Sequence, residues 1–170
     1  MREGIPTKIV STEAVFYVNS VNHITSIIKK NNLTPEQCNI LCSDTPDNLK
    51  KIQRRLGKKF TIGEVPLEGD SHKMFTFCTR TVYLGADFYS LCARSFIFSD
   101  SNIDSLAVDI SEDLPQILGR QRLKENPWKN SATFYYRSTA NYREMKAEDF
   151  QKIIDLSLIH ISEPTRHLRI

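Results

Sequence analysis

Short apolar runs alternate with amphipathic segments along the first third of the chain. Residues 14–18 (AVFYV) form a continuous apolar run, the pattern expected of a strand that is covered on both faces. Residues 20–30 then repeat apolar side chains at helical spacing, and Ser20 is a suitable N-cap. Residues 39–42 (NILC) form a second apolar run, which precedes a helix with Pro46 at its first position. This β-α-β-α order predicts a parallel sheet with helices on both faces.

The remainder of the chain continues this pattern with looser connections. Residues 58–71 include Gly63, Pro66 and Gly69, and we expect them to form a connection or an edge element. Further strands are expected at residues 74–78, 94–98, 106–110 and 132–136. A short amphipathic helix is expected at residues 147–155. The whole pattern predicts an α/β fold.

Composition and charge narrow the function classes only slightly. At 170 residues, with 40% hydrophobic and 25% charged residues, the chain has the size and composition of one globular domain. The net charge of +3 permits a nucleic-acid partner without demanding one. No apolar run reaches the roughly 18 residues of a membrane span, and residues 1–10 lack a signal peptide's apolar region. We therefore expect no membrane partner.

The cysteines and histidines do not suggest a metal centre. The chain contains Cys38, Cys42, Cys78 and Cys92. Their spacings match no zinc pattern, and the first three lie in apolar runs, where a free cysteine behaves as a small hydrophobe. His23 and His72 have no acidic or thiol partner at ligand spacing. We expect buried free thiols in a reducing compartment, which favours the cytoplasm, and no metal ligand in this chain.

The segment at residues 109–122 (DISEDLPQILGRQR) carries the strongest candidate chemistry. Asp113 precedes Gln116 by three residues, the spacing of a capping box at a helix start. At about 100° per residue, one side of this helix would carry Gln116, Gly119, Arg120 and Leu123. Two arginines, Arg120 and Arg122, beside a glycine suit a phosphate, because guanidinium forks make bidentate contacts. A capped helix with a purely structural role is the alternative.

A second informative segment covers residues 75–90. Thr79 follows the expected strand, at its carboxyl end, and ligands bind at this end of the strands in open parallel sheets. Gly85 and Asp87 then form a turn with a carboxylate beside an unhindered backbone. The carboxylate can accept hydrogen bonds from ribose hydroxyls, while the threonine and nearby amides can hold a backbone phosphate. The segment therefore suits contact with a nucleotide or a nucleic acid.

These segments together resemble the superfamily-two helicases. The sequence from Gln116 to Arg122 is similar to motif VI, written Q-x-x-G-R-x-x-R in that family. The segment from Thr79 to Asp87 resembles motif V, and residues 15–20 resemble motif IV. The three matches occur in the family's order within residues 14–136. The ending of the motif VI match is similar to phage and viral replicative helicases of the origin-binding-protein type.

The resemblance implies a RecA-like second motor domain and a role for each matching residue. It assigns the catalytic roles to Gln116, Arg120 and Arg122, nucleotide contacts to Gly85, Asp87 and Gly119, and nucleic-acid backbone contacts to Thr79, Asn19 and Ser43. The family's second arginine would fall on Leu123, so the assignment of the arginine finger between Arg120 and Arg122 stays open. DNA is the expected nucleic acid, with RNA as the alternative.

The resemblance also implies that the nucleotide site is shared with another domain. ATP with Mg²⁺ is the expected ligand, but the sequence contains no G-x-x-x-x-G-K-[ST] and no D-E-x-H-like segment. We therefore expect the phosphate cradle and the metal site to lie in an upstream RecA-like domain of the same protein. This chain is expected to be inactive in ATP hydrolysis by itself. The location would be the cytoplasm, or the host cytoplasm for a phage protein.

Two functions from other classes remain as alternatives. One is a non-catalytic nucleic-acid-binding module, in which the basic segment at residues 50–59 and the aromatic side chains of Trp128, Tyr135 and Tyr136 would do the binding. The other is a different Rossmann-like enzyme with a complete nucleotide site. Such an enzyme would place a glycine-rich turn after the first strand, where residues 19–22 read NSVN.

The end of the chain has a different character. Residues 156–166 (LSLIHISEPTR) resemble the translation of a transposase sequencing adapter, and residues 167–170 would continue it. We therefore expect a helicase domain at residues 1–155 and a non-native tail at residues 156–170, with the natural gene continuing differently. His160 and His167 are accordingly not counted as candidate ligands.

Overall fold

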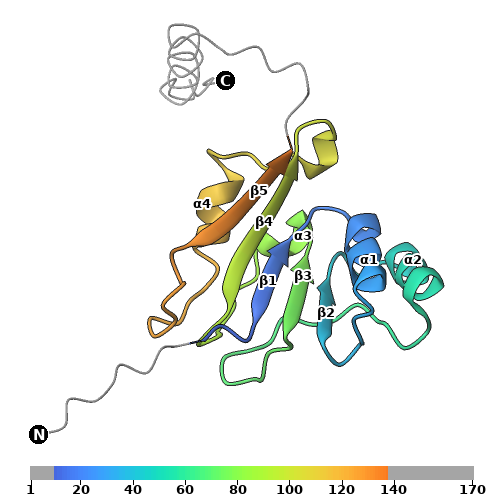
Figure 1. Ribbon diagram of the computed structural model, residues 1–170, viewed down its shortest axis with the longest axis horizontal. Coiled ribbons are helices and arrows are strands. Elements are labelled where there is room, and N and C mark those ends of the chain that lie inside the picture. Colours follow the sequence, from blue (N-terminus) through green and yellow to red (C-terminus); the bar gives the residue numbers. More distant parts are fainter. Residues whose placement is uncertain (1–9, 138–170) are drawn as a thin grey trace, which may run out of the picture. The chain divides into compact units, whose positions relative to one another are not determined.

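Five parallel strands form the centre of the fold (Figure 1). The computed structural model describes residues 10–137. The strands are β1 (Ala14–Tyr17), β2 (Cys38–Leu41), β3 (Phe75–Cys78), β4 (Arg94–Asp100) and β5 (Ala132–Arg137), and their order across the sheet is β2-β3-β1-β4-β5. Every strand pair is parallel. The predicted α/β class is confirmed, with the parallel sheet that RecA-like and Rossmann-type domains share.

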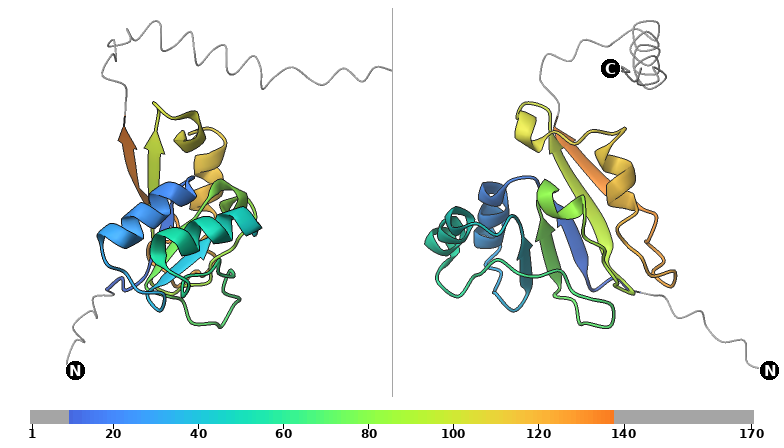
Figure 2. Two further views of the ribbon diagram at one scale, coloured as in Figure 1. Left: turned by 90° about the vertical axis from the view of Figure 1, so that its right-hand side faces the viewer. Right: turned by 180° about the vertical axis from the view of Figure 1, so that it is seen from behind.

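Helices cover both faces of this sheet (Figure 2). They are α1 (Val21–Lys30), α2 (Pro46–Leu56), α3 (Arg80–Tyr83), α4 (Asp113–Leu118) and the short 3₁₀ helix η1 (Asp104–Leu106). Alternate residues of β1 point to opposite faces: Val15 packs into the core beneath α3 and α4, and Val18, just beyond the strand, packs against α1 and α2. Two apolar cores therefore sandwich the sheet.

Local capping signals explain where α1 and α2 begin. Ser20 Oγ accepts a hydrogen bond from the backbone N–H of His23, and Thr45 Oγ1 accepts one from Asn48. Pro46 occupies the first turn of α2, where its missing N–H removes no helical bond. Both starts agree with the prediction from the sequence.

The three cysteines of the apolar runs are buried, as predicted. Cys38 and Cys42 belong to the core beneath α1 and α2, and Cys78 belongs to the core on the other face. Burial raises the pKa of the Cys38 thiol to about 11 and raises the pKa of Cys78 further still. These thiols are therefore protonated at neutral pH and act as packing groups.

The connection at residues 58–71 contains neither helix nor strand, and one of its glycines is required by packing. A Cβ atom on Gly63 would collide with the side-chain oxygen of Asn39. Gly63 N–H donates to Ile40 O at 2.9 Å, and Asn39 Nδ2 donates to Glu64 O at 2.9 Å. The connection is therefore fastened along β2.

The strand predicted at residues 106–110 is wrong. Leu106 ends η1, and the residues after it run as an irregular segment into a turn at residues 110–112. The N–H of Val108 donates to Ser99 Oγ at 3.1 Å rather than to a strand backbone. β5 occupies the position beside β4 in the sheet, so residues 106–110 have no neighbouring strand with which to pair.

Two expectations concern parts of the chain outside the described residues. They are the short helix at residues 147–155 and the adapter-like tail at residues 156–170. Among the helices between residues 10 and 137, none has the length and apolar composition needed to cross a bilayer.

The tight packing of α2 yields the first prediction. Ile52 is fully buried between α2 and the sheet, so Ile52→Ala should lower the free energy of unfolding by about 2–5 kcal/mol through lost burial and an unfilled cavity. Ile110 is 68% exposed, and Ile110→Ala should change it by less than about 0.5 kcal/mol. Urea denaturation of both variants measures the difference, and equal losses would contradict the assigned core.

Candidate functional site

The first part of the site begins where the chain leaves β3. Thr79 is the N-cap of α3, and its N–H donates to Leu41 O of the neighbouring strand at 3.0 Å. Its carbonyl accepts from Val82 and Tyr83 and so closes the single turn of α3. The sequence did not predict this helix, because four residues are too short to show helical periodicity. The turn brings Gly85 and Asp87 back over the face of the sheet that α4 also covers.

The start of α4 differs from the predicted capping box. Glu112, not Asp113, precedes the helix, and it makes no side-chain capping bond. Asp109 supplies the cap instead: its Oδ1 accepts from Ser111 N at 2.7 Å, Ser111 Oγ at 2.6 Å and Glu112 N at 3.0 Å. Asp113 Oδ2 in turn accepts from Asp109 N at 3.1 Å. The predicted capping box is therefore absent: the Asp109 side chain caps the turn before α4, and the Asp113 side chain reaches back to the backbone of Asp109.

The end of α4 corrects the expected helix face. The helix stops at Leu118, with Gly119 as its C-cap, so the arginines lie beyond it. The following chain is extended and pairs with Phe88: Phe88 N–H donates to Arg120 O at 2.8 Å, and Arg122 N–H donates to Phe88 O at 2.9 Å. Side chains alternate in an extended segment, so Arg120 and Arg122 point to one side, and Gln121 lies buried on the other.

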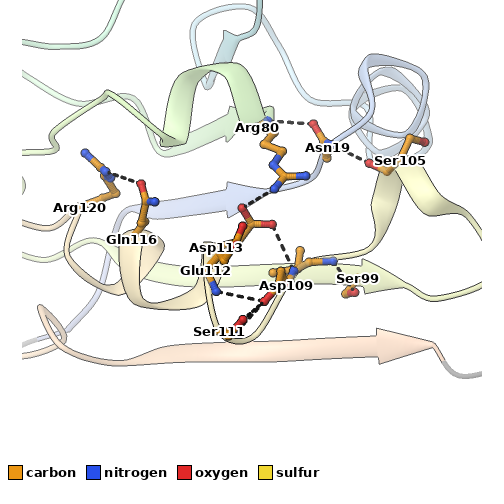
Figure 3. Close-up of polar contacts among 11 residues, drawn as sticks. Asn19, Arg80, Ser99, Ser105, Asp109, Ser111, Glu112, Asp113, Gln116 and Arg120 are labelled. Atoms are coloured by element: carbon orange, nitrogen blue, oxygen red, sulfur yellow. Dashed lines mark hydrogen bonds and ion pairs between the residues drawn. The ribbon is translucent and has the colours of Figure 1, made fainter. Parts of the chain in front are cut away.

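Both arginines converge on one carboxylate. Arg122 Nε lies 2.8 Å from Asp87 Oδ1, and Arg120 Nη1 lies 3.4 Å from the same oxygen. Arg120 Nη2 also donates to Leu84 O at 3.1 Å and to Gln116 Oε1 at 3.3 Å, a contact drawn in Figure 3. The structure therefore brings together four of the residues that the sequence proposed.

The two guanidinium groups differ in exposure. The side chain of Arg120 is 13% exposed and is held by three protein groups, whereas that of Arg122 is 48% exposed and contacts Asp87 alone. A ligand approaching from solvent would meet Arg122 first. Arg120 is placed to hold the segment in position.

The two glycines of the proposed nucleotide contact are not required by the fold. A Cβ atom added to Gly85 would meet no atom within 4 Å, and one added to Gly119 would meet only carbonyl oxygens at 3.6 Å. Neither residue adopts a positive φ. The space beside Gly85 is therefore open to a ligand, which is the property that the sequence analysis expected of it.

One ion pair of this region was missed by the sequence analysis. Arg80 Nη2 lies 3.0 Å from Asp113 Oδ1 (Figure 3), and the side chain of Asp113 is only 2% exposed. The sequence predicts a capping role for Asp113 and no role for Arg80. Only the packing of α3 against α4 reveals the pair, because no sequence spacing relates the two residues.

The three residues proposed to contact nucleic acid lie at the carboxyl ends of adjacent strands. Ser43 follows β2, Thr79 follows β3 and Asn19 follows β1, so they share one edge of the sheet. Asn19 Oδ1 accepts from Arg80 N at 2.9 Å, and its Nδ2 donates to Ser105 O at 2.6 Å. Ser43 Oγ donates to Thr81 Oγ1 at 3.0 Å. The side chains of Asn19 and Ser43 therefore brace the loops of this edge.

The layer beneath the arginines contains buried tyrosines, whose phenol groups are neutral, and the buried side chain of Gln121. Burial, followed by the nearby charge of Asp113, raises the pKa of Tyr83 to about 12. Burial likewise raises the pKa of Tyr17, whose ring meets that of Tyr83 at 5.7 Å. Both phenols stay neutral at physiological pH. Charge interactions above such a layer are stronger than they would be in water.

The described residues offer no metal centre of their own. Between residues 10 and 137, no three His, Cys, Asp or Glu side chains gather closely enough to hold an ion. The arginine pair and the open glycine turn are, by contrast, chemically suited to a phosphate group.

No protein-family model, no curated protein and no solved structure matches this chain. The assignment of a function rests on the geometry of the site and on the motifs in the sequence.

The cap of α4 generates a stability prediction. Hydrogen bonds from the Ser111 side chain and from the backbone of Glu112 and Ser111 lower the pKa of Asp109 from its ordinary 3.8. Asp109→Ala should therefore lower the free energy of unfolding by about 1 kcal/mol at pH 7. Because the folded pKa is depressed, this contribution is complete above pH 3.8 and is lost as the pH falls through the folded pKa.

Urea denaturation at pH 7 and at lower pH tests the cap. Asp104→Ala is the matched control, because the Asp104 side chain makes no hydrogen bond or ion pair in the described structure. A loss of stability from Asp109→Ala that is constant across the acid range would contradict the role of its ionised carboxylate.

Proposed function

We propose that this chain is the second motor domain of an ATP-dependent superfamily-two DNA helicase or translocase. The observation that carries the proposal is the convergence of Arg120 and Arg122, from the segment that resembles motif VI, on Asp87, from the segment that resembles motif V. Those segments are far apart in the sequence, yet they meet on one face of a parallel sheet. Two unrelated short motif matches would not be expected to form ion pairs with each other.

Arg122 is the better candidate for the arginine finger. Its guanidinium is the more exposed of the two and has a single protein partner, so it can exchange Asp87 for a phosphate oxygen at low cost. Such a finger is worth roughly 10³–10⁵ in the rate of phosphoryl transfer. Arg120, held by Gln116 and the carbonyl of Leu84, would position the finger.

Asp87 has two roles in this proposal. Without nucleotide it contacts both guanidinium groups and offsets one of their two positive charges, which reduces the repulsion between them. When the arginines turn to the phosphates of an ATP held by the upstream domain, its carboxylate is free to accept from a ribose hydroxyl. The open space beside Gly85 is where the nucleotide would approach the backbone.

The edge of the sheet formed by Ser43, Thr79 and Asn19 would face one strand of DNA. Backbone amides and hydroxyls at this edge can hold phosphates without regard to sequence. Opening and closing of the cleft between the two motor domains would then step the strand along. RNA remains the alternative partner, since these contacts do not involve a sugar hydroxyl.

The arginines provide a direct test in the complete protein that the gene encodes. Arg122→Ala should reduce DNA-stimulated ATP turnover by about 10³-fold or more, with an unchanged melting temperature and DNA affinity. Arg120→Ala should reduce turnover and also lower the melting temperature, because Arg120 holds Gln116 and Leu84. Steady-state ATPase, thermal unfolding and fluorescence anisotropy with labelled oligo(dT) measure the three quantities.

Arg122→Lys is the matched control, because it keeps the charge without the fork and should recover little turnover. Loss of DNA binding with unaffected turnover would overturn the proposal.

The glycine turn gives an independent test. Gly85→Ala should leave the melting temperature unchanged, because the added methyl group meets no atom within 4 Å, but it should raise the KM for ATP by about tenfold. Gly63→Ala is the opposite control: the methyl group collides with Asn39, so stability falls while the KM is unaffected. An unchanged KM in Gly85→Ala would remove this turn from the nucleotide site.

A non-catalytic nucleic-acid-binding module is the second candidate, and one observation favours it. Lys50, Lys51 and Arg54 are grouped on the outer side of α2. Two other side chains that such a module could use have partners within the chain. Arg55 donates to Asn22 and Ser26 of α1, and Trp128 packs against Arg94. Such a module predicts that neutralising the α2 cations abolishes DNA binding in a protein without DNA-stimulated turnover.

A further inference from the structure

Asp113 is a buried carboxylate that the proposed chemistry does not use. Its side chain is 2% exposed, and each of its oxygens has one partner: Oδ1 the guanidinium of Arg80, and Oδ2 the N–H of Asp109. The Arg80 side chain of this pair is 44% exposed, and ion pairs with an exposed partner usually contribute little to stability. Its position in the fold suggests a different role.

Arg80 connects three parts of the molecule. Its backbone N–H donates to Asn19 in the loop after β1, and its side chain reaches Asp113 at the start of α4. Asn19 is itself joined to η1 through Ser105 O. Figure 3 shows these contacts as a continuous row from Ser105 through Asn19 and Arg80 to Asp113. These contacts link the loop after β1 to the start of α4.

Helix α4 is held at both ends by the segment between β3 and β4. Its start is joined to Arg80, and the chain beyond its end is joined to Asp87 through Arg120 and Arg122. Six residues of α-helix span only about 9 Å. This short helix therefore lies between the Arg80–Asp113 contact at its start and, beyond its C-cap Gly119, the segment that carries Arg120 and Arg122.

We infer that the Arg80–Asp113 ion pair couples the DNA-facing edge of the sheet to the arginines of the nucleotide site. The inference rests on the proposed function and extends it by assigning two positioning residues. DNA held at the edge formed by Asn19, Thr79 and Ser43 fixes the loop after β1. The ion pair transfers that position to α4, which then presents Arg122 to the nucleotide.

The coupling can be tested by removing the pair without leaving a buried charge. Arg80→Gln alone would leave the buried Asp113 carboxylate without a cation. The double variant Arg80→Gln/Asp113→Asn instead leaves two neutral side chains that can still hydrogen-bond. In the complete protein, we expect the double variant to keep its basal ATP turnover and its affinity for oligo(dT). The ratio of DNA-stimulated to basal turnover should fall by about fivefold or more, the lower bound for a typical coupling between sites.

Two further variants separate coupling from general damage. Arg80→Lys keeps a cation that can reach Asp113 and should retain most of the stimulation. Arg137→Gln removes an arginine whose side chain is 78% exposed from a separate ion pair with Asp100, and it should leave the ratio unchanged. Melting temperatures of all variants report whether the fold is affected.

The outcomes distinguish this inference from the proposed function. If the unsubstituted complete protein shows no DNA-stimulated turnover, the proposed function fails and the coupling fails with it. If that protein is stimulated and the double variant is stimulated equally, the coupling is overturned while the function stands. A proportional loss of basal and stimulated turnover, with a lower melting temperature, would also overturn the coupling and assign the pair to stability.

Discussion

The parallel direction of all five strands is the constraint on which the site depends. A parallel sheet collects the carboxyl ends of its strands at one edge, so the loops after β1, β2 and β3 meet there although the chain separates them widely. Each connection must also cross back over the sheet, and the crossing that contains α3 and the one that contains α4 lie on the same face. The contact between the two candidate segments follows from this topology.

The charged side chains of the site do not balance one another. Three arginines (Arg80, Arg120 and Arg122) face two carboxylates (Asp87 and Asp113), which leaves one positive charge in excess. Asp113 is buried and has one guanidinium partner, whereas Asp87 is partly exposed and is shared by Arg120 and Arg122. The unbalanced charge therefore lies at the surface, on the side of Arg122, where an anion can complete the set.

The sequence predicted most of the framework because the relevant signals are local. Apolar runs located all five strands within about two residues, and Ser20 and Pro46 marked the starts of α1 and α2. The failures required tertiary information. Asp113 has the spacing of an N-cap in the sequence, but it is buried as the first residue of α4 and pairs with Arg80. Residues 106–110 have the composition of a strand, but β5 occupies the position beside β4. For the site, the motifs identified the residues but not their contacts.

The pairing of Phe88 with Gln121 has a consequence for how the two arginines are arranged. In an extended segment, side chains two residues apart share a side, whereas in a helix the matching interval is three or four. The R-x-R spacing of this chain and the R-x-x-R spacing of the family pattern can therefore present two guanidinium groups to one place by different backbone routes. A single inserted residue after Arg120 would rotate the next arginine to the side on which Gln121 is buried, and only one guanidinium group would then face Asp87.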